Sequence, residues 1–145
     1  MNGSRLVKAF AAGVLGACVL TVAHELLRRY LPRAPRLDIL GMKSIARVSR
    51  AAGAETPAHL HESALLGDLI SNAGYYSLVG IAGREKALYV GAGLGLAAGL
   101  GAVAIPGPLG LGAAATARTS STQLMTVALY TTGGLIAGSL YRALD

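Results

Sequence analysis

The sequence predicts an all-α integral membrane protein, with four transmembrane helices and a short amphipathic interfacial helix after the first. Of the 145 residues, 53% are hydrophobic and 14% are charged, whereas a soluble domain averages about 45–50% apolar and about 25% charged. Four apolar runs of about 20 residues follow one another, the length that a helix needs to cross about 30 Å of hydrocarbon. This composition excludes a disordered chain, a disulfide scaffold and most soluble enzymes.

The four runs form one predicted transmembrane domain over residues 1–145, a four-helix bundle. We expect the spans over residues 9–27, 64–83, 87–105 and 122–141. Lys8 precedes the first span, and Pro32 prevents its continuation. A short charged hairpin at residues 84–86 separates the second and third spans, Pro106 stops the third, and Arg142 closes the fourth.

The first run has an alternative interpretation as a cleaved signal peptide. Arg5 and Lys8 precede an apolar stretch that ends near Ala23, a pattern that such peptides share. The residues that follow, Leu26, Leu27 and a cluster of cations, are instead typical of the cytoplasmic end of a span. We therefore expect a retained membrane helix.

The loop over residues 28–63 carries much of the positive charge. The net charge is +6, and seven of the 13 Lys and Arg residues lie in this loop: Arg28, Arg29, Arg33, Arg36, Lys43, Arg47 and Arg50. Cations between apolar runs suit anionic lipid headgroups, so we expect the lipid bilayer as a partner and no nucleic acid. Residues 36–50 predict a basic amphipathic helix in the headgroup layer, or, as a compatible alternative, a helix that caps the bundle.

The distribution of cations predicts an orientation. With four spans, the loop over residues 28–63 and Arg118 together place eight cations on one side, and the remaining five lie on the other. The positive-inside rule then makes the basic loop cytoplasmic and leaves both termini outside. The predicted location is a multi-pass cell membrane, the inner membrane if the source is bacterial.

Small residues recur at intervals of four in the third and fourth spans. Residues four apart share a helix face, and close contact through small residues holds helices together in lipid. The predicted helix-packing residues are Gly91, Gly95 and Gly99 in one row, Gly93 and Gly101 in a second, and Gly134 and Gly138 in the fourth span. This glycine-zipper pattern fits packing within one chain, contact in a homo-oligomer or larger membrane complex, or the lining of a pore.

Ionisable side chains gather at one end of the predicted bundle. The candidates for a proton, ion or metal site are His24, Glu25, His61, Glu62, Asp68 and Asn72. Asp68 is expected about 6–9 Å inside its span, where insertion scales give a charge a cost of up to about 2.5–3.5 kcal/mol. It must therefore be paired, hydrogen-bonded, protonated or hydrated, and its candidate partners are Asn72, His24 and Arg28.

Four interpretations of these polar residues stay open. They are contact with lipid headgroups, a proton or cation relay through Asp68, a metal site that also uses His59, and a haem between two histidines. Spacing does not favour a metal, because His59 and His61 are two residues apart and His24 lacks a second histidine four residues on. No cofactor is predicted, and a metal ion remains an alternative.

The sequence favours a structural or accessory membrane subunit that docks through its glycine faces, rather than an enzyme. The alternative is a small proton or cation transporter or channel that uses Asp68, and a metal-dependent membrane enzyme is third. Access of water to Asp68 separates the first two. A polar cavity that reaches this carboxyl group favours transport, whereas a dry, paired carboxyl group favours a structural role.

Overall fold

The computed structural model describes residues 3–144, and these residues form helices without any β-strand. The elements are α1 (Gly3–Tyr30), α2 (Leu37–Ala51), α3 (Leu60–Tyr76), the 3₁₀ helices η1 (Ser77–Ala82) and η2 (Arg84–Lys86), α4 (Ala87–Ala104), α5 (Ala114–Ala117) and α6 (Ser120–Leu144). The expected all-α class is confirmed. Within the described range, three helical segments are long and apolar enough to cross a membrane, namely α1, η2 with α4, and α6.

The predicted second span, residues 64–83, is not one continuous α-helix. Its α-helical part, α3, has 17 residues and ends at Tyr76, and the chain continues as the six-residue 3₁₀ helix η1. Near this change the hydroxyl of Ser77 donates a hydrogen bond to the Gly74 carbonyl at 2.6 Å, and such local bonds compete with the helical pattern. Gly83 follows with φ of +74°, a conformation that glycine adopts without steric strain.

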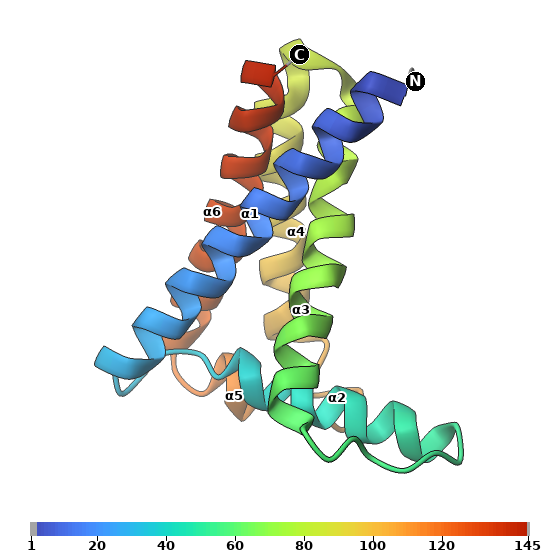
Figure 1. Cartoon of the computed structure of the whole chain (residues 1–145). Helices are drawn as coiled ribbons and strands as arrows, with labels where there is room; N and C mark the ends of the chain where they lie inside the picture. The colour runs from blue at the N-terminus through green and yellow to red at the C-terminus, as the bar shows by residue number, and fades with distance from the viewer. Residues whose placement is uncertain (1–2, 145) are drawn as a thin grey trace.

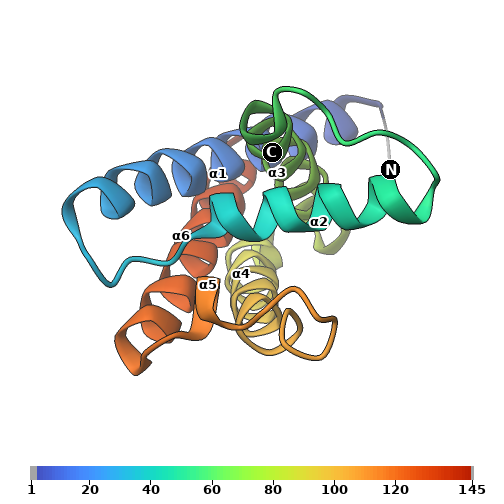
Figure 2. The same ribbon diagram turned by 90° about the horizontal axis from the view of Figure 1, so that it is seen from below.

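The long elements run side by side between two ends of the molecule (Figure 1). The start of α1, the end of α6 and the turn before α4 lie at one end, while α2 and α5 lie at the other. Seen from below, α2 crosses the base of the bundle (Figure 2). Helix α4 packs along α6, and α1 packs on α6 and α3, but α3 makes few contacts with α4.

Two glycines let α1 approach both of its neighbours. A Cβ atom on Gly13 would collide with the carbonyl oxygen of Ala73 in α3, and one on Gly16 would lie 2.5 Å from the carbonyl oxygen of Gly133 in α6. Such contact between backbones is the means by which helices associate in lipid, where no hydrophobic force acts between them.

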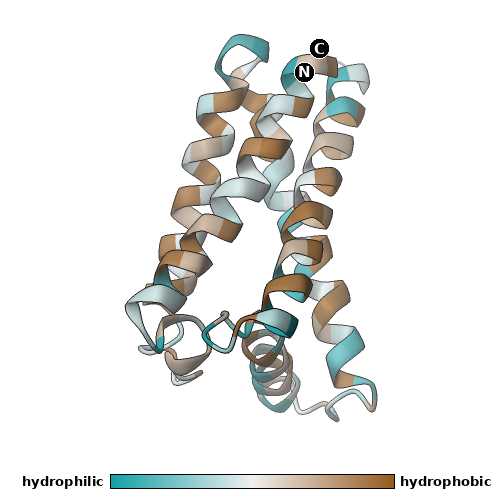
Figure 3. Ribbon diagram, turned by 90° about the vertical axis from the view of Figure 1, so that its left-hand side faces the viewer, coloured by the Kyte–Doolittle hydropathy of each residue, from teal (hydrophilic) through white to brown (hydrophobic). Residues whose placement is uncertain are grey.

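Many large apolar side chains of the helices are exposed, and hydrophobic residues occur along the length of the long helices (Figure 3). The most exposed include Phe10, Val22, Ile70, Tyr89 and Leu124. The interior is instead filled by alanine and glycine with a few larger side chains, among them the fully buried Leu20, Tyr76 and Tyr141. An apolar exterior around an interior of small residues is the arrangement expected of helices that face lipid.

Hydrogen bonds between loops hold the end of the bundle that carries α2. The side chain of Lys43 donates to the Leu111 carbonyl at 3.0 Å, and Arg118 donates to the Pro32 carbonyl at 2.8 Å. The backbone N–H of Arg36 donates to the Ala115 carbonyl at 2.7 Å. The segment before α2 and the segment around α5 are thus bound to each other, which sets the position of α2 below the helices.

Candidate functional site

One row of glycines in α4 packs against α6. Gly91, Gly95 and Gly99 are buried, and a Cβ atom on any of them would come within 3 Å of the α6 backbone. Gly134 and Gly138 of α6 approach α4 in the same way, since a Cβ atom on Gly138 would lie 2.5 Å from the Ala87 carbonyl oxygen. These five glycines therefore face one another inside the chain.

The second row of α4 is not covered by another helix of the described chain. A Cβ atom on Gly93 would have no neighbour within 4 Å, and one on Gly101 would meet only Ile105, which follows in its own chain segment, at 3.4 Å. Ala97, which lies between them in this row, is exposed. This face of α4 is directed toward α3 and the surroundings.

His24 joins the end of α1 to the start of α2. It is 4% exposed, its Nε2 atom accepts a hydrogen bond from the Leu37 N–H at 3.2 Å, and the same atom lies 3.2 Å from the Pro35 carbonyl oxygen. Its Nδ1 atom lies 3.6 Å from a carboxylate oxygen of Glu25. The imidazole is therefore enclosed by protein groups and does not face lipid headgroups.

Arg28, one of the three expected partners of Asp68, is engaged elsewhere. Its guanidinium donates two hydrogen bonds to the carboxylate of Glu25, at 2.7 and 2.6 Å, within the last turns of α1. The i, i+3 spacing places the two groups on one helix face. Glu25 and Arg28 thus neutralise each other.

Asp38 is a buried carboxylate that the sequence analysis missed. Its side chain is 3% exposed and accepts two hydrogen bonds from the guanidinium of Arg36, at 2.9 and 2.7 Å. Burial favours the neutral acid, but the bonds and charge of Arg36 and the N–H of Ile39 outweigh it and hold the pKa of Asp38 below its usual value. The feature of the sequence that could have indicated Asp38 is its position as an acidic residue in the first turn of a helix.

Asp68 has a hydrogen-bond partner but no charged one. The Asn72 amide donates to one of its carboxylate oxygens at 3.0 Å. No ion pair links Asp68 to any described Lys, Arg or His residue. Of the three expected partners, Asn72 is the one that contacts it.

A cavity of about 10 Å³, room for about one water molecule, lies where α1, α2 and α3 meet. Its lining includes Thr21 and His24 of α1, Asp38 of α2, and His61 and Asp68 of α3. The Thr21 hydroxyl is buried and has no hydrogen-bond partner among the described residues. The structure therefore gathers His24, His61 and Asp68 around one small cavity, and adds Asp38.

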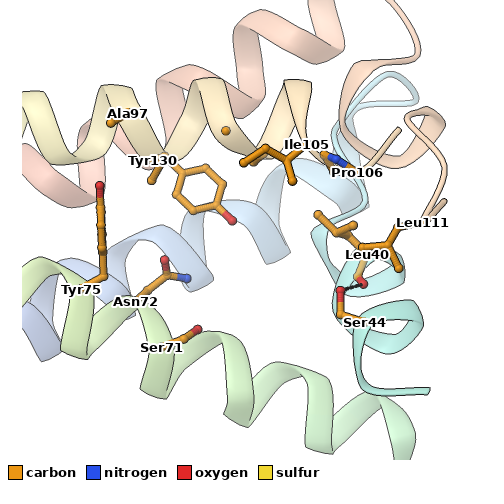
Figure 4. Close-up of a pocket in the computed structure, with 13 residues that line it drawn as sticks. Leu40, Ser44, Ser71, Asn72, Tyr75, Ala97, Ile105, Pro106, Leu111 and Tyr130 are labelled. Atoms are coloured by element: carbon orange, nitrogen blue, oxygen red, sulfur yellow. Dashed lines mark hydrogen bonds between the residues drawn. The ribbon is translucent and has the colours of Figure 1, made fainter. Parts of the chain in front are cut away.

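The structure holds two larger cavities beside these helices, with volumes of about 330 and 570 Å³. They share Leu40, Ser44, Ser71 and Tyr130, so we treat them together as the α3–α4 cleft. Helix α4 lines the larger cavity, whereas the described lining of the smaller one comes from α2, α3 and Tyr130 of α6. Asp68 lines the smaller one, and Asn72, Tyr75, Ala97 and Gly101 line the larger one (Figure 4). The Tyr75 hydroxyl donates to the Leu94 carbonyl at 3.1 Å and so links α3 to α4 across the cleft.

The remaining candidates lie away from this site. Glu62 and His59 are exposed near the start of α3, and neither lines a cavity described above. Among residues 3–144, no group of three or more His, Cys, Asp or Glu side chains is close enough to hold a metal ion. The described residues thus offer no ligand set for the metal interpretation.

The fold and the site define a class: an all-helical chain with three helices of membrane-crossing length and a polar cluster where α1, α2 and α3 meet. Comparison of the chain with protein-family models, curated proteins and solved structures finds no match. Its function is therefore argued from the site alone.

Proposed function

We propose that the chain is a polytopic membrane protein with four spans, in which α3 and η1 together form the second. Helices α1 and α4 both run toward the end that carries α2, so the chain must return between them, and α3 with η1 is the segment that does so (Figure 1). The 17 residues of α3 and the six of η1 rise by about 25 and about 12 Å, enough to cross the hydrocarbon layer.

In this arrangement α2 lies flat in the headgroup layer on the cytoplasmic side. It crosses the base of the bundle, and its cations Lys43, Arg47 and Arg50 are exposed (Figure 2). Its apolar residues Leu40 and Ile45 turn toward the cleft. A helix with this division of side chains binds anionic lipid through its basic face.

The function proposed for this protein is reversible binding of a proton or a cation at Asp68, as in a small transporter or channel. The observation that carries the proposal is that Asp68 lines both the small cavity and the α3–α4 cleft, yet forms no ion pair with a Lys, Arg or His among residues 3–144. An ionisable group inside a span is costly unless it is compensated. A carboxyl group held by one amide and reached from two cavities is suited to take up and release a positive charge.

Asp68 shares the small cavity with two histidines near the end that carries α2. The small cavity lies between it and the pair of histidines, His24 and His61, at that end. Histidine and carboxyl groups are the usual members of proton relays in membranes. The unpartnered Thr21 hydroxyl in the same cavity would bind one water molecule between them.

Flux through liposomes tests the proposal. The purified protein is reconstituted with a pH-sensitive dye inside, and proton or cation flux is measured for the wild type, Asp68→Asn and Glu62→Gln. Flux is expected in the wild type and in Glu62→Gln, an exposed carboxylate of the same helix, and is expected to be lost in Asp68→Asn at unchanged thermal stability. Equal flux in Asp68→Asn, or none in the wild type, would overturn it.

A second candidate, an accessory subunit, is favoured by the uncovered small-residue face of α4. Gly93 has no neighbour within 4 Å, and Ala97 beside it is exposed. Such a face fits a further helix, from a second copy or from another membrane protein. The mass of the detergent-solubilised complex tests this: Gly93→Leu should reduce it to that of the monomer. A wild-type monomer would exclude self-association.

A further inference from the structure

We infer that the α3–α4 cleft receives a lipophilic cation, an apolar molecule with one positive charge, which competes with the proton for Asp68. The inference rests on the proposed function of Asp68 and names a substrate class for it. The size of the cleft, its single carboxyl group and its mostly apolar lining support this substrate class.

The size of the cleft suits an organic molecule. Its larger cavity has a volume of about 570 Å³, within the range of about 300–1,000 Å³ that is typical of sites for small organic ligands. The space exists because α4 presents Ala97, Gly101 and other small residues toward α3. Ser71 and Ala97 in its lining are exposed, so a molecule dissolved in the bilayer can enter between the two helices.

The charge of the cleft selects a cation. Asp68 is the only ionisable Asp, Glu, Lys, Arg or His residue in the described lining of either cavity. Lys43 and Arg47 of α2 are not in the described lining of either cavity, although Lys43 donates to the carbonyl of Leu111, which lines the larger one. A carboxylate in an apolar space is stable only with a proton or a positive charge beside it.

The lining does not suit a small hydrated ion. Such an ion must exchange its water shell for several oxygen ligands. The hydroxyls of Ser44 and Ser71 lie against carbonyls of their own helices, those of Leu40 at 2.9 Å and of Asp68 at 3.1 Å. Most of the remaining lining is apolar, and Tyr75 and Tyr130 add aromatic rings, which attract organic cations (Figure 4).

Binding of tetraphenylphosphonium to the purified protein in detergent, measured by calorimetry, tests the inference. Tetraphenylborate, an anion of nearly the same shape, is the matched probe. The cation is expected to bind the wild type, to bind more weakly as the pH is lowered, and to lose at least tenfold in affinity in Asp68→Asn. The anion is expected not to bind. Thermal unfolding of each variant shows that it is folded.

A variant that fills the cleft provides a second test of the inference. Ala97→Phe places a ring in the cleft from an exposed position and should lower the affinity for tetraphenylphosphonium at least tenfold. Ala104→Phe, at an exposed alanine of α4 outside the cleft lining, should leave it unchanged.

The outcomes separate the inference from the proposed function. Equal binding of the cation to Asp68→Asn, or of the anion to the wild type, would show an apolar groove for a lipid chain or partner helix and overturn the inference. Proton flux that depends on Asp68, without any binding of tetraphenylphosphonium, would overturn the inference and leave the proposed function standing. If the protein shows neither Asp68-dependent flux nor binding of tetraphenylphosphonium, the inference and the proposed function are both overturned.

Discussion

A Cβ atom on Gly95 would lie 2.5 Å from the carbonyl oxygen of Tyr130, because α4 and α6 pack backbone against backbone at this position. Gly99 approaches Val127 in the same way, with 2.7 Å between its Cβ position and the Val127 Cα atom. At this separation, dispersion and weak Cα–H···O contacts supply the attraction between two helices in lipid.

We predict that Gly95→Leu and Gly99→Leu separate α4 from α6. The added side chain meets backbone, which cannot move aside as a flexible side chain does, and overpacking of this kind destabilises by about 1–3 kcal/mol or more. Thermal unfolding in detergent measures the loss. Ala104→Leu is the control, since Ala104 is an exposed residue of the same helix. Equal stability of all three variants would show that the α4–α6 contact is wrong.

The Arg36–Asp38 pair makes stability depend on pH. Because the pKa of Asp38 is lowered in the folded protein, its contribution is fully present above the pKa of an unfolded aspartate, about 3.9. It is lost as the pH falls through the lower, folded pKa. Asp38→Asn should therefore unfold at a lower temperature than the wild type at pH 7, with the difference shrinking below about pH 4. A difference that is constant down to pH 3 would contradict the assignment.

We expect His24→Ala to destabilise the junction between α1 and α2. The substitution leaves the buried N–H of Leu37 without its acceptor, and an unsatisfied buried group costs about 1–3 kcal/mol. Thermal unfolding compares this variant with His59→Ala, which removes an exposed imidazole. If His24→Ala unfolds at the same temperature as His59→Ala, the role of the His24 ring at this junction is refuted.

The orientation is tested by labelling cysteines in intact cells. In a Cys18→Ala background, a cysteine in place of Glu55, in the exposed loop before α3, should resist a thiol reagent that does not cross membranes. A cysteine in place of Glu85, exposed in η2 at the opposite end, should react readily. The reverse labelling pattern would show that the protein has the opposite orientation in the membrane.

Several local features of this protein could be predicted from its sequence. The apolar runs and their flanking cations and prolines locate α4 and α6 within three residues, whereas α1 begins six residues before the predicted span. Helix formation depends on nearby residues and on a length set by the bilayer. The contact between Asp68 and Asn72 was also predictable, since residues four apart share a helix face.

Three other features were decided by the tertiary structure. The covered glycine row of α4, the cleft beside its second row, and the burial of Asp38 all depend on which helices become neighbours. An apolar or small residue in a membrane helix suits lipid and protein alike, so its pattern along the chain does not say which of them it meets. The sequence by itself determined that this protein forms apolar helices with a carboxyl group among them. Only the packing of those helices decided that Asp68 opens onto a cleft and has no cationic partner among the residues that the structure describes.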